Sequence, residues 1–130
     1  MPVTPLYAAL LAVLFLVLSI ATIKGRQRNR VSLGDGGHSD LARAIRVHGN
    51  FAEYVPMTLV LMLALESLNG PSPWLHLPGL LLLAGRAVHA FGVSQQQEKL
   101  VFRVAGMMMT FLAMVLCIIG IGARYLLALA

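Results

Sequence analysis

Long hydrophobic stretches alternate with short polar segments along the whole chain. Residues 1–23 carry no charged side chain, and a second uncharged run extends over residues 104–123. A hydrocarbon core about 30 Å thick is crossed by about 20 helical residues. The pattern therefore predicts membrane-spanning helices over residues 5–23 and 100–127.

Two further hydrophobic segments, residues 41–68 and 74–93, have helical length but are interrupted by ionisable side chains. Residues 69–73, Asn-Gly-Pro-Ser-Pro, are strong helix breakers and predict a turn between the two helices. Ser39 or Asp40 is a suitable N-cap for the earlier one. The sequence thus predicts a single all-α domain over residues 1–130, a bundle of four transmembrane helices.

The glycine-rich stretch at residues 34–37 also has the composition of a phosphate-binding loop. No strand precedes it and no Gly-Lys-Ser/Thr follows, so a turn is the favoured interpretation. The first hydrophobic segment resembles a secretory signal only in part, because its positive charges follow the hydrophobic run instead of preceding it. We therefore expect it to remain as a membrane span.

Composition supports a membrane protein. Hydrophobic residues make up 58% of the chain and charged residues only 12%, against roughly 25% charged residues in soluble domains. The formal net charge is +5, but the basic residues lie beside the hydrophobic segments. Contact with anionic lipid headgroups explains this placement better than binding to nucleic acid. Cys117 is the only cysteine, so no disulfide framework is expected.

The loops differ in positive charge, which predicts the orientation of the chain because Lys-rich and Arg-rich loops stay in the cytoplasm. The loop after the first predicted helix holds four basic residues, Lys24, Arg26, Arg28 and Arg30, and the loop after the second holds none. The loop after the third holds Lys99 and leads to Arg103. We expect both termini outside and the first and third loops in the cytoplasm.

Polar side chains gather on one face of the second predicted helix. On a helical wheel with Arg43 at the origin, Arg46, Asn50, Glu53 and Tyr54 all fall within an arc of about 100°. Ionisable groups inside a membrane are costly, so this face should be hidden from lipid and is a candidate functional site.

Other polar residues join this set. Arg86 and His89 stand three residues apart near the cytoplasmic end of the third helix, and Arg103 begins the fourth. Together with the face of the second helix they predict a cationic pocket that opens to the cytoplasm. His48 falls outside the arc and needs a different neighbour, and Glu66 lies further along the same helix.

A purely structural interpretation competes with this one. Arginines at helix ends often extend to lipid headgroups, and a glutamate can simply pair with an arginine in the bundle. A single structural pair would need neither Asn50 nor Tyr54, whereas a polar ligand with several contacts would use both. The four histidines show neither the spacing nor the cysteine partners of a zinc site, so we expect no metal.

Residues 46–56, Arg-Val-His-Gly-Asn-Phe-Ala-Glu-Tyr-Val-Pro, resemble the central motif of the MAPEG family, the membrane-associated proteins in eicosanoid and glutathione metabolism. The family motif reads Arg-x-x-x-Asn-x-x-Glu-Tyr/Asn-x-Pro. The resemblance continues through residues 82–89, Leu-Leu-Ala-Gly-Arg-Ala-Val-His, to residues 103–107, Arg-Val-Ala-Gly-Met, and covers nearly the whole chain. The closest likeness is to the short branch of bacterial inner-membrane proteins.

This resemblance implies a homotrimer with three sites between subunits at the cytoplasmic face. It implies a glutathione transferase or peroxidase that acts on lipophilic electrophiles, with Arg103 as the catalytic cation that stabilises the thiolate. The glutathione-binding set implied by the family and by the predicted pocket is Arg46, His48, Asn50, Glu53, Tyr54, Arg86 and His89, with Arg26 or Arg28 reaching a carboxylate. Glutathione carries two carboxylates, an ammonium and a thiol, which these residue types suit.

The chain departs from its family at a few positions. His48 stands where some relatives carry glutamine, His89 near a family tyrosine, and Val93 where a further tyrosine would follow. An alternative function is therefore kept, a non-catalytic membrane protein of the same fold that binds a lipid or an amphipathic anion between subunits. A small multidrug exporter is disfavoured, because such proteins resemble one another in an acidic residue in the first helix, which is lacking here.

Two expectations concern packing. In a trimer the second helix should lie nearest the symmetry axis or the subunit seam, where its polar face is hidden from lipid. The small residues Ala84, Ala87 and Ala90 should let the third helix approach a neighbour closely.

Overall fold

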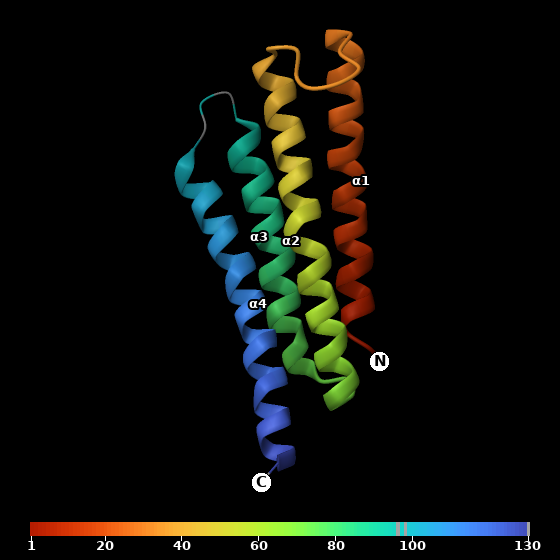
Figure 1. Cartoon of the computed structure of the whole chain (residues 1–130), viewed down its shortest axis with the longest axis vertical. Helices are drawn as coiled ribbons and strands as arrows, with labels where there is room; N and C mark the ends of the chain where they lie inside the picture. Colours follow the sequence, from red (N-terminus) through yellow and green to blue (C-terminus); the bar gives the residue numbers. More distant parts are fainter. Residues whose placement is uncertain (96, 98, 130) are drawn as a thin grey trace.

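Four long helices lie side by side in the computed structural model, which describes residues 1–95, 97 and 99–129 (Figure 1). In chain order they are α1 (Thr4–Asn29), α2 (Ser39–Asn69), α3 (His76–Ser94) and α4 (Leu100–Leu129), and the 3₁₀ turn η1 (Pro73–Leu75) precedes α3. All four are long and hydrophobic enough to cross a membrane. The predicted all-α bundle of four transmembrane helices is confirmed.

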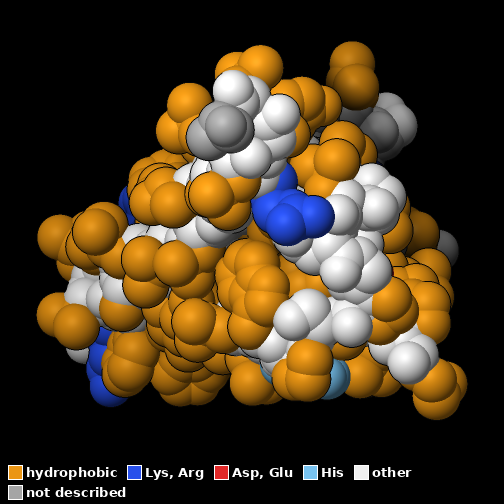
Figure 2. Space-filling view, turned by 90° about the horizontal axis from the view of Figure 1, so that it is seen from below, with side chains coloured by type: hydrophobic (Ala, Val, Ile, Leu, Met, Phe, Trp, Pro, Cys, Tyr) orange, Lys and Arg blue, Asp and Glu red, His pale blue; other side chains and the backbone are white. Residues whose placement is uncertain are grey.

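The helices run up and down, so the bundle has two distinct ends. The α1–α2 and α3–α4 connections lie at one end, called here the loop end, and both termini lie at the other with the α2–α3 connection, called the terminal end (Figure 1). The terminal end is covered mostly by hydrophobic side chains (Figure 2). The basic residues at the end of α1 and around the start of α4, Lys24, Arg26, Arg28, Lys99 and Arg103, belong to the loop end.

Helix α1 is longer than its hydrophobic stretch, for it continues past residue 23 to Asn29. Hydropathy marks where the apolar residues stop, but Lys24, Gln27 and Arg28 favour helix and can project beyond the membrane core. The residue that follows the helix, Arg30, has a left-handed backbone conformation with a φ of 54°. The N–H of Val31 donates to the carbonyl oxygen of Arg26 at 3.0 Å. This is a common helix C-terminal arrangement.

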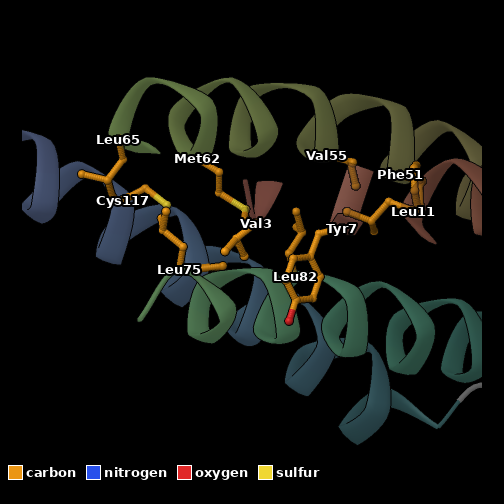
Figure 3. Packing of buried hydrophobic residues seen from close by; sticks show 11 residues of the cluster. Val3, Tyr7, Leu11, Phe51, Val55, Met62, Leu65, Leu75, Leu82 and Cys117 are labelled. Atoms are coloured by element: carbon orange, nitrogen blue, oxygen red, sulfur yellow. The ribbon is translucent and has the colours of Figure 1, made fainter. Parts of the chain in front are cut away.

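A hydrophobic core fills the space between the helices (Figure 3). Its buried side chains come from α1, α2, η1, α3 and α4, namely Tyr7, Leu11, Phe51, Val55, Met62, Leu65, Leu75, Leu82, Ala113 and Cys117. The thiol of Cys117 lies within this packing and is fully buried. It behaves there as a small hydrophobic side chain.

Helices α3 and α4 touch through their backbones at glycines. A Cβ atom added to Gly106 would lie 2.5 Å from the carbonyl oxygen of Gly85, and one added to Gly92 would lie 2.9 Å from the backbone nitrogen of Arg103. Only residues without a side chain allow this approach, as in other close pairs of membrane helices.

Of the three alanines predicted to let α3 approach a neighbour, only Ala90 is buried within the protomer, and contact of the other two with a neighbouring subunit stays a prediction. Ala84 and Ala87 lie on the exposed surface of the protomer. A three-residue spacing of alanines marks one stripe of a helix, whereas the contact with α4 follows the neighbouring stripe through Gly85 and Gly92.

Glu66 has a structural role at the terminal end. Its carboxylate accepts hydrogen bonds from the backbone N–H groups of Val3 and Thr4, the second at 3.0 Å, and its residue is only 8% exposed. These are the first N–H groups of α1, which have no partner within the helix. A negative charge at a helix N-terminus is also favourable. Glu66 thus joins α2 to the start of α1.

The substitution Glu66→Gln is expected to destabilise the protein by about 1–3 kcal/mol, because the amide keeps one acceptor oxygen but loses the charge and the second acceptor. Unfolding in mixed detergent micelles measures the change. Asp35→Asn serves as the control, since it removes the same charge at an exposed position in the α1–α2 connection. Equal stability of Glu66→Gln and the parent protein would show that this contact contributes little.

Candidate functional site

A polar cavity of about 180 Å³ opens at the loop end between α2, α3 and α4. Its lining consists of Arg46, Asn50, Tyr54, His89, Val93, Arg103 and Met107. On each helix the lining residues are spaced four apart, which places them on one face one turn above the other. The cavity lies where the sequence predicts a cationic pocket.

The helices hold these side chains at different depths. Asn50 and His89 are buried, Tyr54 and Arg103 are half-buried, and Arg46 is exposed at the mouth. The ring of Tyr54 packs edge to face against Phe111 of α4, with centroids 5.5 Å apart. An aromatic contact of this kind fixes the ring and leaves its hydroxyl free to point elsewhere.

Two arginines therefore face one small cavity from different helices. Arg46 comes from α2, and Arg103 lies in the first turn of α4, where the N-terminal end of the helix adds positive potential. The remaining polar lining, Asn50, Tyr54 and His89, supplies groups that hydrogen-bond a ligand. The arrangement is suited to an anionic ligand with several polar atoms.

Arg86 lies behind the cavity and not in its lining. Only 2% of the residue is exposed, and its guanidinium donates a hydrogen bond of 2.7 Å to the Oδ1 of Asn50. It also reaches the Gly106 carbonyl oxygen and the Met107 Sδ, both at 3.3 Å. The guanidinium thus connects α3 to α2 and to α4.

Several residues of the predicted site do not reach this cavity within one protomer. His48 turns to α1, where its ring stacks on Phe15 at 4.8 Å and its Nε2 lies 3.1 Å from the Ser19 hydroxyl. Glu53 is exposed on the outer surface of α2. The position of His48 outside the polar arc of α2 agrees with this separate neighbourhood.

Two basic residues in the last turn of α1 contact the α1–α2 connection and the start of α2. Arg26 donates to the carbonyl oxygens of Ser32 and Gly34, at 3.3 and 2.8 Å. Arg28 lies 3.9 Å from the Asp40 carboxylate, and both side chains are largely exposed. Neither arginine lines the cavity.

Two residues that line the cavity, Val93 and Met107, were not predicted as site residues from the sequence. Met107 lies one helical turn after Arg103, and Val93 lies one turn after His89. This four-residue spacing could have indicated that they share a helix face with predicted site residues. Met107 appears in the sequence only as part of a family-like motif, and Val93 only as a departure from the family pattern.

Fold and cavity together define an integral membrane protein with a polar pocket at one end of a four-helix bundle. Residues 4–123 match the MAPEG family, and the chain belongs to that family. It is 42% identical to the inner membrane protein YecN of Escherichia coli strain K12 over 119 residues, which are 91% of this chain and 88% of that protein.

YecN from a second Escherichia coli strain, O6:H1, matches with the same identity and coverage. No solved structure matches the chain. The relatives are named as inner membrane proteins, which agrees with the four membrane-spanning helices of this chain.

Proposed function

We propose that this protein is a membrane-embedded, glutathione-dependent transferase or peroxidase that acts on lipophilic electrophiles. The observation that carries the proposal is the convergence of Arg46 and Arg103 with Asn50, Tyr54 and His89 on one cavity. Glutathione presents two carboxylates and a thiol, so it favours a site with cations and hydrogen-bonding side chains. Membership of the MAPEG family agrees with this ligand class.

Arg103 is the proposed catalytic residue. A thiol reacts as its thiolate, and a fixed cation beside sulfur lowers the pKa of the thiol. Arginine stays protonated in a membrane pocket at any relevant pH. The position of Arg103 in the first turn of α4 adds the positive end of the helix to the charge of the guanidinium.

One protomer supplies only part of the proposed site. A cavity of about 180 Å³ is smaller than the roughly 300–1,000 Å³ of pockets that enclose drug-sized ligands. Glu53 and Arg46 lie exposed on the same surface of α2, where a charged side chain would otherwise face lipid. We therefore propose a homotrimer in which a neighbouring protomer covers this face, with Glu53 holding the glutathione ammonium and Arg26 or Arg28 a carboxylate.

The electrophile would reach the site from the bilayer. Next to Arg103, an open hydrophobic groove of about 410 Å³ runs along α4, lined by Leu100, Val101, Val104 and Ala105. A lipophilic compound dissolved in lipid could enter there and meet the thiolate. With the positively charged loop end in the cytoplasm and both termini outside, glutathione would come from the cytoplasm.

The substitution Glu53→Gln is expected to weaken glutathione binding by roughly 1–3 kcal/mol, because the amide no longer pairs with the ammonium of the ligand. Isothermal titration calorimetry of the detergent-solubilised protein measures this loss. Asp35→Asn is the matched control, since it removes the same charge from the α1–α2 connection at a residue outside the proposed binding set, and its side-chain oxygen can still accept from the Gly37 N–H.

Two results would contradict the proposal. Parent protein that binds no glutathione would leave the cavity to a lipid or an amphipathic anion, for which the neighbouring hydrophobic groove also has room. Equal affinity of Glu53→Gln and the parent would remove Glu53 from the binding set.

A further inference from the structure

Arg86 is the most deeply buried charged residue that the structure describes, and it lies next to the cavity without lining it. Burial of an arginine inside a membrane protein is costly unless its donors are satisfied. Its two terminal nitrogens contact the side chain of Asn50 on α2 and residues 106 and 107 on α4, whereas its Nε has no hydrogen-bond partner among the described residues. These contacts place it between the two helices that carry Arg46 and Arg103.

The contact with Asn50 determines which way the Asn50 amide faces. A guanidinium has only donors, so the atom of Asn50 that lies 2.7 Å from Arg86 must be the accepting oxygen, Oδ1. The amide NH₂ group of Asn50 is then the polar group left for the cavity, which Asn50 lines. Asn50 is therefore set as a hydrogen-bond donor toward the ligand.

The contacts with α4 act on the helix that carries Arg103. The carbonyl of Gly106 and the sulfur of Met107 lie one turn after Arg103, and both are 3.3 Å from Arg86. The same carbonyl accepts a hydrogen bond of 2.9 Å from the Thr110 hydroxyl. Arg86 thus fixes the first turns of α4 against α2 as well as the orientation of Asn50.

We propose that Arg86 is a positioning residue that presents Asn50 as a donor to acceptor-rich, anionic ligands, and that it does so from behind the cavity without touching the ligand. The inference rests on the proposed function for the identity of the ligand, glutathione. The sequence predicts that Arg86 contacts the ligand directly. Its proposed role is instead to hold Asn50 and the helix of Arg103, both of which line the cavity, in place.

The test uses two substitutions in the full-length, detergent-solubilised protein. Arg86→Lys keeps the positive charge but replaces the planar fork by a single ammonium, which cannot hold Asn50 and α4 together. Asn50→Asp keeps an oxygen acceptor facing Arg86 and replaces the NH₂ donor by a second carboxylate oxygen, so the side chain becomes negatively charged and can no longer donate to a ligand. Both are expected to bind glutathione at least tenfold more weakly by calorimetry, while Asn50→Asp unfolds at the temperature of the parent or above it.

Arg124→Lys is the matched control, because Arg124 lies at the terminal end of the bundle, where it donates to the Leu68 carbonyl oxygen. It should bind glutathione as tightly as the parent. If Arg86→Lys binds as tightly as the parent, Arg86 does not position the site. If Arg86→Lys fails to fold, Asn50→Asp decides, and parent-like affinity in that variant contradicts the donor role of Asn50.

A ligand-free measurement separates this inference from the proposed function. The chain has three asparagines, so protein labelled only at asparagine gives three side-chain NH₂ signals in an NMR spectrum, and Asn50→Asp identifies the one from Asn50. Arg86→Lys should move that signal and leave those of Asn29 and Asn69 in place. An unmoved Asn50 signal overturns the positioning role, whereas a moved signal in a protein that binds no glutathione contradicts only the proposed ligand.

Discussion

Replacement of Arg103 by alanine is expected to lower kcat/KM for the conjugation of glutathione with an aryl halide by about a hundredfold. Removal of one fixed group that stabilises a reacting anion typically costs about 10²–10³ in rate. Arg103 lines the cavity from the first turn of α4, so its loss removes the cation beside the proposed position of sulfur. Steady-state kinetics in detergent or in lipid nanodiscs measures the effect.

Arg124→Ala is the control for a general effect of lost charge, since Arg124 lies at the other end of α4. It should keep the parent rate. A parent-like rate for Arg103→Ala would leave Arg103 as a contact to lipid headgroups. The search for a catalytic cation would then turn to Lys99, which directly precedes α4, or to Arg46 in the cavity lining.

The substitution Gly106→Leu is expected to destabilise the protein by more than about 3 kcal/mol or to prevent folding. The new Cβ would lie 2.5 Å from the Gly85 carbonyl oxygen and 2.6 Å from the His89 backbone nitrogen. Both neighbours are backbone atoms of α3, so neither can move away without separating the two helices. Unfolding in mixed micelles measures the loss.

Gly122→Leu is the matched control on the same helix, because a Cβ at Gly122 meets no described atom within 4 Å. It should leave stability nearly unchanged or raise it slightly, since leucine favours helix over glycine. Equal effects at the two positions would show that α3 and α4 are not packed as closely as described.

The helices could be predicted from the sequence because membrane spans leave a strong signal. An uncharged run of about 20 residues has few structural alternatives. The end of α1 could not be predicted in this way, because its last turns leave the hydrophobic segment and are held by helix propensity and by the left-handed residue Arg30. The contact of α3 with α4 could not be predicted from the spacing of small residues either, because the spacing does not show which stripe of α3 faces α4.

The site was predicted in part for a similar reason. A helical wheel gives the direction of each side chain but not the helix that it meets. Arg46, Asn50 and Tyr54 face the contact with α3 and α4, and the structure brings them to one cavity. Glu53 stands at the edge of the same arc and faces outward. The sequence spacing of Arg86 and His89 could not show that one lies behind the cavity and the other lines it.

We propose that this cavity binds glutathione and holds it as a thiolate beside Arg103. The most direct test is an ultraviolet difference spectrum of the purified protein titrated with glutathione near neutral pH, where free thiol is largely protonated. We expect a thiolate absorbance to develop as the site fills, and we expect Arg103→Ala to abolish this absorbance while glutathione still binds. Binding of glutathione to the parent only as the thiol, or an equally strong thiolate signal in Arg103→Ala, would rule out this role of Arg103.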